Sequence, residues 1–85
     1  MANCDKLFVK ARNSPNNFAF REICELAECK GWEFRRQSSS HFIFENPKLT
    51  QEQGRVQNLQ DFKGKAKPYQ VRQLLRAIEF LEDED

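Results

Sequence analysis

The segment 32–47 constrains the fold most, because two short apolar runs there follow a strand-like pattern on either side of a run of serines. Large apolar and charged residues alternate over 32–35, and Phe42-Ile43-Phe44 is aromatic and β-branched. Pro47 ends the second run, since proline donates no backbone hydrogen bond to a sheet. The segment therefore predicts a β-hairpin whose connection is 37–40, with His41 beside the bend.

Helical periodicity flanks this hairpin on both sides. Apolar residues recur at helical spacing from Phe18 to about Lys30, with Asn16 or Asn17 as the predicted N-cap, and again after Pro68. A shorter helix is expected over 3–12. Residues 55–62 predict a weaker third strand in which a bulge is possible, and 63–67 predict a basic connection.

The order of predicted elements is helix, helix, strand, strand, strand, helix. This order indicates an α+β fold with a three-stranded antiparallel sheet, both long helices on one face and the other face open. The 85 residues suit one domain spanning 1–85, with 1–15 as a short helical appendage and 83–85 as an acidic tail that frays. A core of this size requires neither a metal nor a disulfide.

Three cysteines, Cys4, Cys24 and Cys29, are an odd number without C-x-x-C spacing. Cys24 and Cys29 could be imagined as metal ligands with His41, but five residues on a helix separate two side chains by about 140°. No apolar signal segment or membrane span is apparent. The cysteines are therefore expected to be reduced packing residues in a cytoplasmic protein that binds no metal.

The charge is unevenly distributed although the formal net charge is only +1. Within 30–76 the basic residues outnumber the acidic ones: Lys30, Arg35, Arg36, Lys48, Arg55, Lys63, Lys65, Lys67, Arg72 and Arg76 against Glu33, Glu45, Glu52 and Asp61. That segment could hold a polyanion, whereas the pI of about 7.7 favours a solvated surface of mixed charge.

The stretch RRQSSSHFIFENP, the short strand after it and KGKAKPYQVRQLLRAIE resemble the HicA toxins, small ribonucleases of bacterial and archaeal toxin-antitoxin systems. The resemblance extends from about Phe18 to Glu79. In that family a Gly-Ser-His step opens the second strand and carries the catalytic histidine. Ser40 and His41 match this step, Ser39 stands where glycine is usual, and Phe42 replaces a histidine common at its position.

The resemblance implies a double-stranded-RNA-binding-domain-like fold, messenger RNA as substrate, no cofactor and a HicB-like antitoxin as protein partner. It also implies that His41 is the catalytic residue. The expected RNA-binding residues are cations that could stabilise the charge developing on the phosphate, together with two serines of the motif, namely Arg35, Arg36, Ser39, Ser40, Lys63, Lys65 and Lys67. The free chain is expected to be a monomer without membrane contact.

The chemistry of metal-free RNA cleavage fits one histidine in part. The neighbouring 2′-hydroxyl attacks the phosphate, which needs a base for its proton and an acid for the leaving 5′-oxygen, and imidazole serves either role near neutral pH. The second role falls to water, a phosphate oxygen, Tyr69 or a lysine.

The alternative function is a non-catalytic RNA- or protein-binding module of the same fold, in which His41 is a surface histidine at a hairpin bend and the lysines form a solvated loop.

Overall fold

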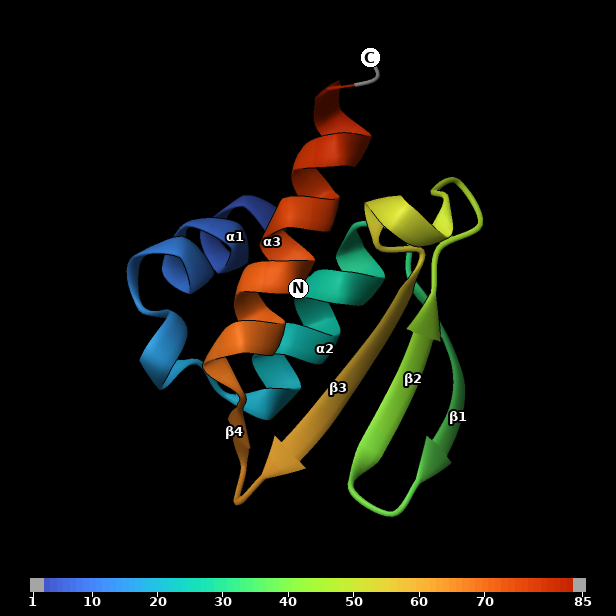
Figure 1. The fold of residues 1–85 in the computed structure, drawn as a ribbon. Helices are drawn as coiled ribbons and strands as arrows, with labels where there is room; N and C mark the ends of the chain where they lie inside the picture. The colour runs from blue at the N-terminus through green and yellow to red at the C-terminus, as the bar shows by residue number, and fades with distance from the viewer. Residues whose placement is uncertain (1–2, 84–85) are drawn as a thin grey trace.

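The structure, a computed structural model, describes residues 3–83. Its helices are α1 (Cys4–Asn13), α2 (Phe20–Cys29) and α3 (Pro68–Asp83), and its strands are β1 (Glu33–Ser38), β2 (His41–Glu45), β3 (Val56–Phe62) and β4 (Lys65–Ala66). Two single 3₁₀ turns, η1 (Pro15–Asn17) and η2 (Gln51–Gln53), complete the α+β fold, whose helices gather on one side of the sheet (Figure 1). The expected frayed tail begins at Asp83, the last residue of α3, and its residues 84–85 lie outside the described part.

The antiparallel sheet has four strands in the order β1-β2-β3-β4, so the prediction of three strands is wrong by one. β4 lies in the predicted basic connection and pairs with the end of β3. Two residues cannot show an apolar alternation, and the strand forms because the chain reverses at Lys63 and Gly64, which have φ of 52° and 83°. The Ala66 N–H then donates to the Phe18 carbonyl at 2.9 Å, which ties β4 to the start of the helical layer.

The strand register divides the sheet into two faces. Phe42 lies opposite Leu59 and Phe44 opposite Gln57, and these side chains turn toward the helices. His41 lies opposite Gln60, and Ile43 opposite Asn58, on the side that the helices leave uncovered. We call this side the open face; its residues are Glu33, Arg36, Ser38, His41, Ile43, Glu45, Val56, Asn58, Gln60, Phe62 and Lys65.

β3 lacked a clear alternation in the sequence because a glutamine takes one of its buried positions. Gln57 is almost fully buried, and its amide donates to the Gly54 carbonyl at 3.0 Å. Leu59 is buried on the same side, whereas Val56 and Phe62 are exposed on the open face. The pairing of β2 with β3 is regular, and the irregularity lies instead between β1 and β2, around Arg35.

The two long helices bury their apolar stripes as predicted. Ile23 and Leu26 of α2 and Leu74 and Ile78 of α3 are inaccessible to solvent. The predicted N-cap of α2 is wrong, because Asn16 and Asn17 form η1 and the helix begins three residues later with Ala19 as N-cap. Alanine has no side-chain oxygen to cap the helix, but the Glu22 carboxylate accepts the Ala19 N–H at 3.2 Å and so stabilises this end of α2.

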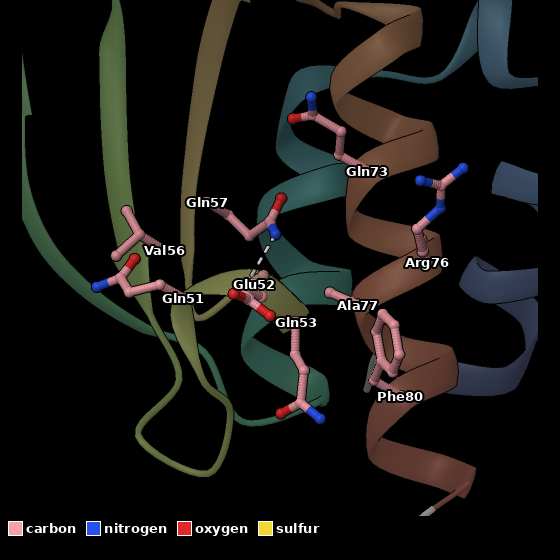
Figure 2. Close-up of a pocket in the computed structure, with 10 residues that line it drawn as sticks. Gln51, Glu52, Gln53, Val56, Gln57, Gln73, Arg76, Ala77 and Phe80 are labelled. Carbon is pink, nitrogen blue, oxygen red and sulfur yellow. Dashed lines mark hydrogen bonds between the residues drawn. The ribbon is translucent and has the colours of Figure 1, made fainter.

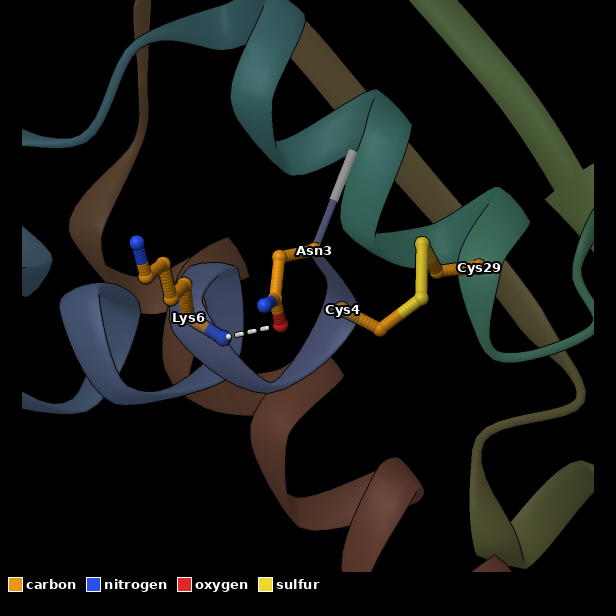
Figure 3. Close-up of a disulfide and its surroundings, with 4 residues drawn as sticks. All are labelled: Asn3, Cys4, Lys6 and Cys29. Carbon is orange, nitrogen blue, oxygen red and sulfur yellow. Dashed lines mark hydrogen bonds between the residues drawn. A yellow bond between two sulfur atoms is a disulfide. The ribbon is translucent and has the colours of Figure 1, made fainter. Parts of the chain in front are cut away.

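α1 packs against α2 and α3, and a disulfide joins its first residue to the last residue of α2 (Figure 3). The expectation of three reduced cysteines is therefore wrong for Cys4 and Cys29, whose Cα atoms lie 5.8 Å apart. Sequence spacing could not indicate this pairing, because it depends on α1 folding back across the end of α2. Cys24 is the free cysteine, and burial raises the pKa of its thiol to about 12.

Within residues 3–83 no helix is long and apolar enough to cross a lipid bilayer.

Candidate functional site

His41 is the first residue of β2, and its side chain projects from the open face beside the hairpin bend. Its Nδ1 lies 2.9 Å from Oδ1 of Asn58 on the neighbouring strand β3. A carboxamide oxygen only accepts, so Nδ1 carries the proton and donates it. In the neutral imidazole this arrangement leaves the lone pair on Nε2, which can accept a proton from a bound molecule.

Asn58 is the member of this pair that sequence reasoning missed. It stands on the open face opposite Ile43 and is a diagonal neighbour of His41, two register positions from Gln60, the residue paired with His41. An asparagine in a weakly patterned strand carries no sequence signal of its own. It could have been found only from the register of β2 with β3, which places it beside the histidine.

The bend before His41 has an unusual backbone. Ser39, the first of the two residues between β1 and β2, has φ of 56°, a conformation that glycine adopts without steric cost. A positive φ at this residue and not at Ser40 is the pattern of a type II′ turn, which matches the twist of a hairpin. The Ser40 carbonyl accepts the Asp61 N–H at 2.9 Å, which fixes the bend to the end of β3.

The three predicted lysines surround Phe62 at the same end of the open face. The ammonium Nζ atoms of Lys67 and Lys63 lie 4.7 and 5.7 Å from the centroid of the Phe62 ring, and Lys65 pairs with Phe62 in the strand register. None of the three forms an ion pair with a described residue. The structure thus brings the predicted cations together around an exposed aromatic ring that the sequence analysis did not select.

The two predicted arginines differ in their surroundings. Arg35 forms ion pairs with Glu33 and Glu45, at 3.2 Å in both cases, and Glu45 also accepts a hydrogen bond from Arg55 at 2.7 Å. The bond from Arg55, together with the charges of both arginines, lowers the pKa of Glu45. Arg36 has no ion pair with any residue in 3–83 and stands on the open face opposite Ile43. Of the two, Arg36 is the one whose charge is available to an anion.

Tyr69, a suggested second proton-transfer group, lies at the start of α3 with about half of its surface exposed. Its hydroxyl accepts a hydrogen bond from the Gln70 side chain at 3.2 Å. Gln70 in turn accepts the backbone N–H of Gln60 at 2.8 Å, and Gln60 is the residue opposite His41. Tyr69 is therefore connected to the strand beside His41 through Gln70.

A concavity of about 300 Å³ lies elsewhere, between η2, the start of β3 and α3 (Figure 2). Its walls include Gln51, Gln73 and Arg76, with the ring of Phe80 at one end. None of the predicted site residues lines it. The predicted residues concentrate instead at the hairpin end of the open face, which we take as the candidate site.

Among the described residues, no three His, Cys, Asp or Glu side chains lie close enough together to hold a metal ion. In comparisons with known proteins, the chain matched no protein family, no curated protein and no solved structure.

Proposed function

We propose that this protein is a ribonuclease toxin of the HicA kind, which cleaves messenger RNA without a metal ion and uses His41 as its proton-transfer group. The observation that carries the proposal is the His41 imidazole on the open face, held at Nδ1 by Asn58. A side chain held in one tautomer on a rigid strand is suited to take a proton from a ribose hydroxyl.

In the proposed reaction the ribose 2′-oxygen attacks the adjacent phosphorus and the bond from phosphorus to the 5′-oxygen breaks. Nε2 of His41 accepts the 2′-hydroxyl proton, and water or a second side chain supplies the proton for the leaving oxygen. Arg36, Lys63 and Lys67, which form no ion pair within residues 3–83, stand on the same face and can stabilise the negative charge that develops on the phosphate.

Two features support the resemblance to the HicA toxins. The positive φ of Ser39 occurs at the position where that family carries glycine, so the bend has the conformation that the family residue favours. The order of α2, β1, β2, β3 and α3 also agrees with the double-stranded-RNA-binding-domain-like fold that the resemblance implies, with α1 and β4 as additions.

The experiment that tests the proposal is cleavage of a single-stranded RNA by the purified protein in the presence of a chelator. We expect cleavage that leaves a 2′,3′-cyclic phosphate and a 5′-hydroxyl, because the 2′-oxygen is the nucleophile. An oligonucleotide of the same sequence with 2′-deoxyribose throughout should stay intact. Cleavage of this DNA control, or loss of RNA cleavage on adding the chelator, would contradict the mechanism. Binding of RNA without cleavage would favour the alternative function, a binding module.

We also propose that a HicB-like antitoxin covers the open face and the lysines around Phe62, with an acidic surface of its own. Reversing the charge of Lys63, Lys65 and Lys67 together should weaken antitoxin binding at least tenfold and weaken RNA binding with a strong dependence on salt. Calorimetric titration with the antitoxin and RNA binding at several salt concentrations measure the two effects. A triple variant that keeps both affinities would show that the lysines are a solvated loop.

A further inference from the structure

Phe62 is the last residue of β3, and about half of its surface (50%) is exposed to solvent. It differs from Phe42 and Phe44, the phenylalanines of β2, because these turn toward the helices and pack against the core. The side chain at Phe62 thus contributes little to the core. A single exposed apolar ring is common on protein surfaces, so a binding role for this one depends on what surrounds it.

The surroundings of this ring are cationic. Lys67 and Lys63 place their ammonium groups within 6 Å of its centroid, and Lys65 faces it across the strand pair. Asp61 is the acidic residue next to Phe62, but strand alternation directs it away from the open face. Its carboxylate accepts the Gly64 N–H at 2.8 Å and supports the turn.

Phe62 is also a near neighbour of His41 in the strand register. His41 lies opposite Gln60, so Phe62 is its diagonal neighbour on the open face, and diagonal neighbours in a sheet have Cα atoms roughly 7–8 Å apart. That separation is comparable with the distance between successive nucleotides in an extended single strand of RNA. A nucleotide whose phosphate reaches His41 can therefore place an adjacent base over Phe62.

We propose that Phe62 is a stacking platform for one unpaired base of the RNA, with the phosphates on either side of that base bound by Lys63, Lys65 and Lys67. The inference rests on the proposed function and specifies its substrate: RNA that is single-stranded next to the cleaved bond. Successive bases stack on exposed aromatic rings in proteins that bind single strands, whereas a duplex keeps its bases stacked inside the helix. In the free protein the lysine side chains lie near the ring, and binding exchanges these contacts for phosphates and a base.

The test uses the His41→Ala protein, which keeps the RNA intact, and a fluorescently labelled single-stranded RNA beside the same strand in a duplex. We expect Phe62→Leu to weaken binding of the single strand by about 5- to 150-fold, the range that corresponds to loss of one stacked base. Binding of the duplex should stay unchanged, and Phe62→Trp should keep full affinity for the single strand. Because Leu carries no charge, the slope of affinity against salt should stay constant, whereas Lys67→Gln should reduce it by about 0.7.

Phe80→Leu is the matched control. Phe80 is a phenylalanine of similar exposure (39%), but it lies on α3 beside the concavity of Figure 2 rather than on the open face. Circular dichroism of each variant shows whether the fold is kept.

Equal affinities of Phe62→Leu and Phe80→Leu for the single strand would overturn the proposal, as would an equal loss for single strand and duplex. A Phe62→Leu protein that binds RNA normally but loses an antitoxin partner would identify the ring as a protein contact and would also overturn it. The same measurements distinguish failure of this proposal from failure of the proposed function. If the wild-type protein cleaves no RNA while Phe62→Leu still reduces single-strand binding, the stacking platform stands and the ribonuclease does not.

Discussion

His41→Ala should lower the rate of RNA cleavage by roughly 10²- to 10⁴-fold, the usual contribution of a positioned acid or base. The variant should remain folded, because His41 is only partly buried and its side-chain hydrogen bond goes to the exposed Asn58. Its affinity for RNA should change far less, since phosphate contacts from arginine and lysine supply most of the binding. The measurement is the initial rate of cleavage of one long RNA by both proteins in the presence of a chelator.

Arg76→Ala is a suitable control for this comparison. Arg76 is exposed on α3 and lines the concavity, which contains none of the predicted site residues, so its loss should leave cleavage at the wild-type rate. Folding of both variants is checked by circular dichroism. Wild-type activity in a folded His41→Ala protein would remove the histidine from the mechanism.

Ile23→Asp and Leu74→Asp should each destabilise the domain by about 3–5 kcal/mol, because each places an unpaired carboxylate where solvent cannot reach. A domain of this length has a total stability of roughly 4–13 kcal/mol, so either change removes a large share of it. Thermal melts should show a decrease of about 15 °C or more, or no cooperative transition at all.

The same Arg76→Ala variant serves as the stability control. Its side chain is exposed and has no ion pair among the described residues, so the free energy of unfolding should change by less than about 0.5 kcal/mol. Melts of Ile23→Asp and Leu74→Asp that coincide with the wild-type curve would contradict the packing of α2 and α3 described above.

Much of the fold could be predicted from residues whose spacing reports burial directly. Each long helix turns one face to the core, so its buried residues recur at helical intervals. These residues are Ile23 and Leu26 in α2 and Leu74 and Ile78 in α3. The hairpin was indicated equally well, since Phe42 and Phe44 alternate with residues of the open face. In these segments local pattern and tertiary environment agree.

The features that could not be predicted depend on contacts between distant parts of the chain. β4 pairs locally with β3, but its Ala66 N–H also bonds to the distant Phe18 carbonyl, and the Cys4–Cys29 bond exists because α1 returns to the end of α2. At the candidate site, the alternation of side chains along a strand was enough to predict that His41 and Phe42 lie on opposite faces of the sheet. Asn58, the hydrogen-bond partner of its Nδ1, could be identified only from the register of β2 with β3, and no local pattern around Asn58 reveals that register.

The disulfide between α1 and α2 makes the stability of this protein depend on the redox conditions around it. It closes a covalent loop over residues 4–29, and the open face lies outside that loop. By loop entropy, closing about 25 residues disfavours the unfolded chain by roughly 3.5 kcal/mol. In a reducing compartment the unfolded fraction would then be roughly 300-fold higher, and proteases act on that fraction. The number of surviving molecules would follow the thiol chemistry of the compartment, while each folded molecule would keep the same histidine, asparagine and lysines in place.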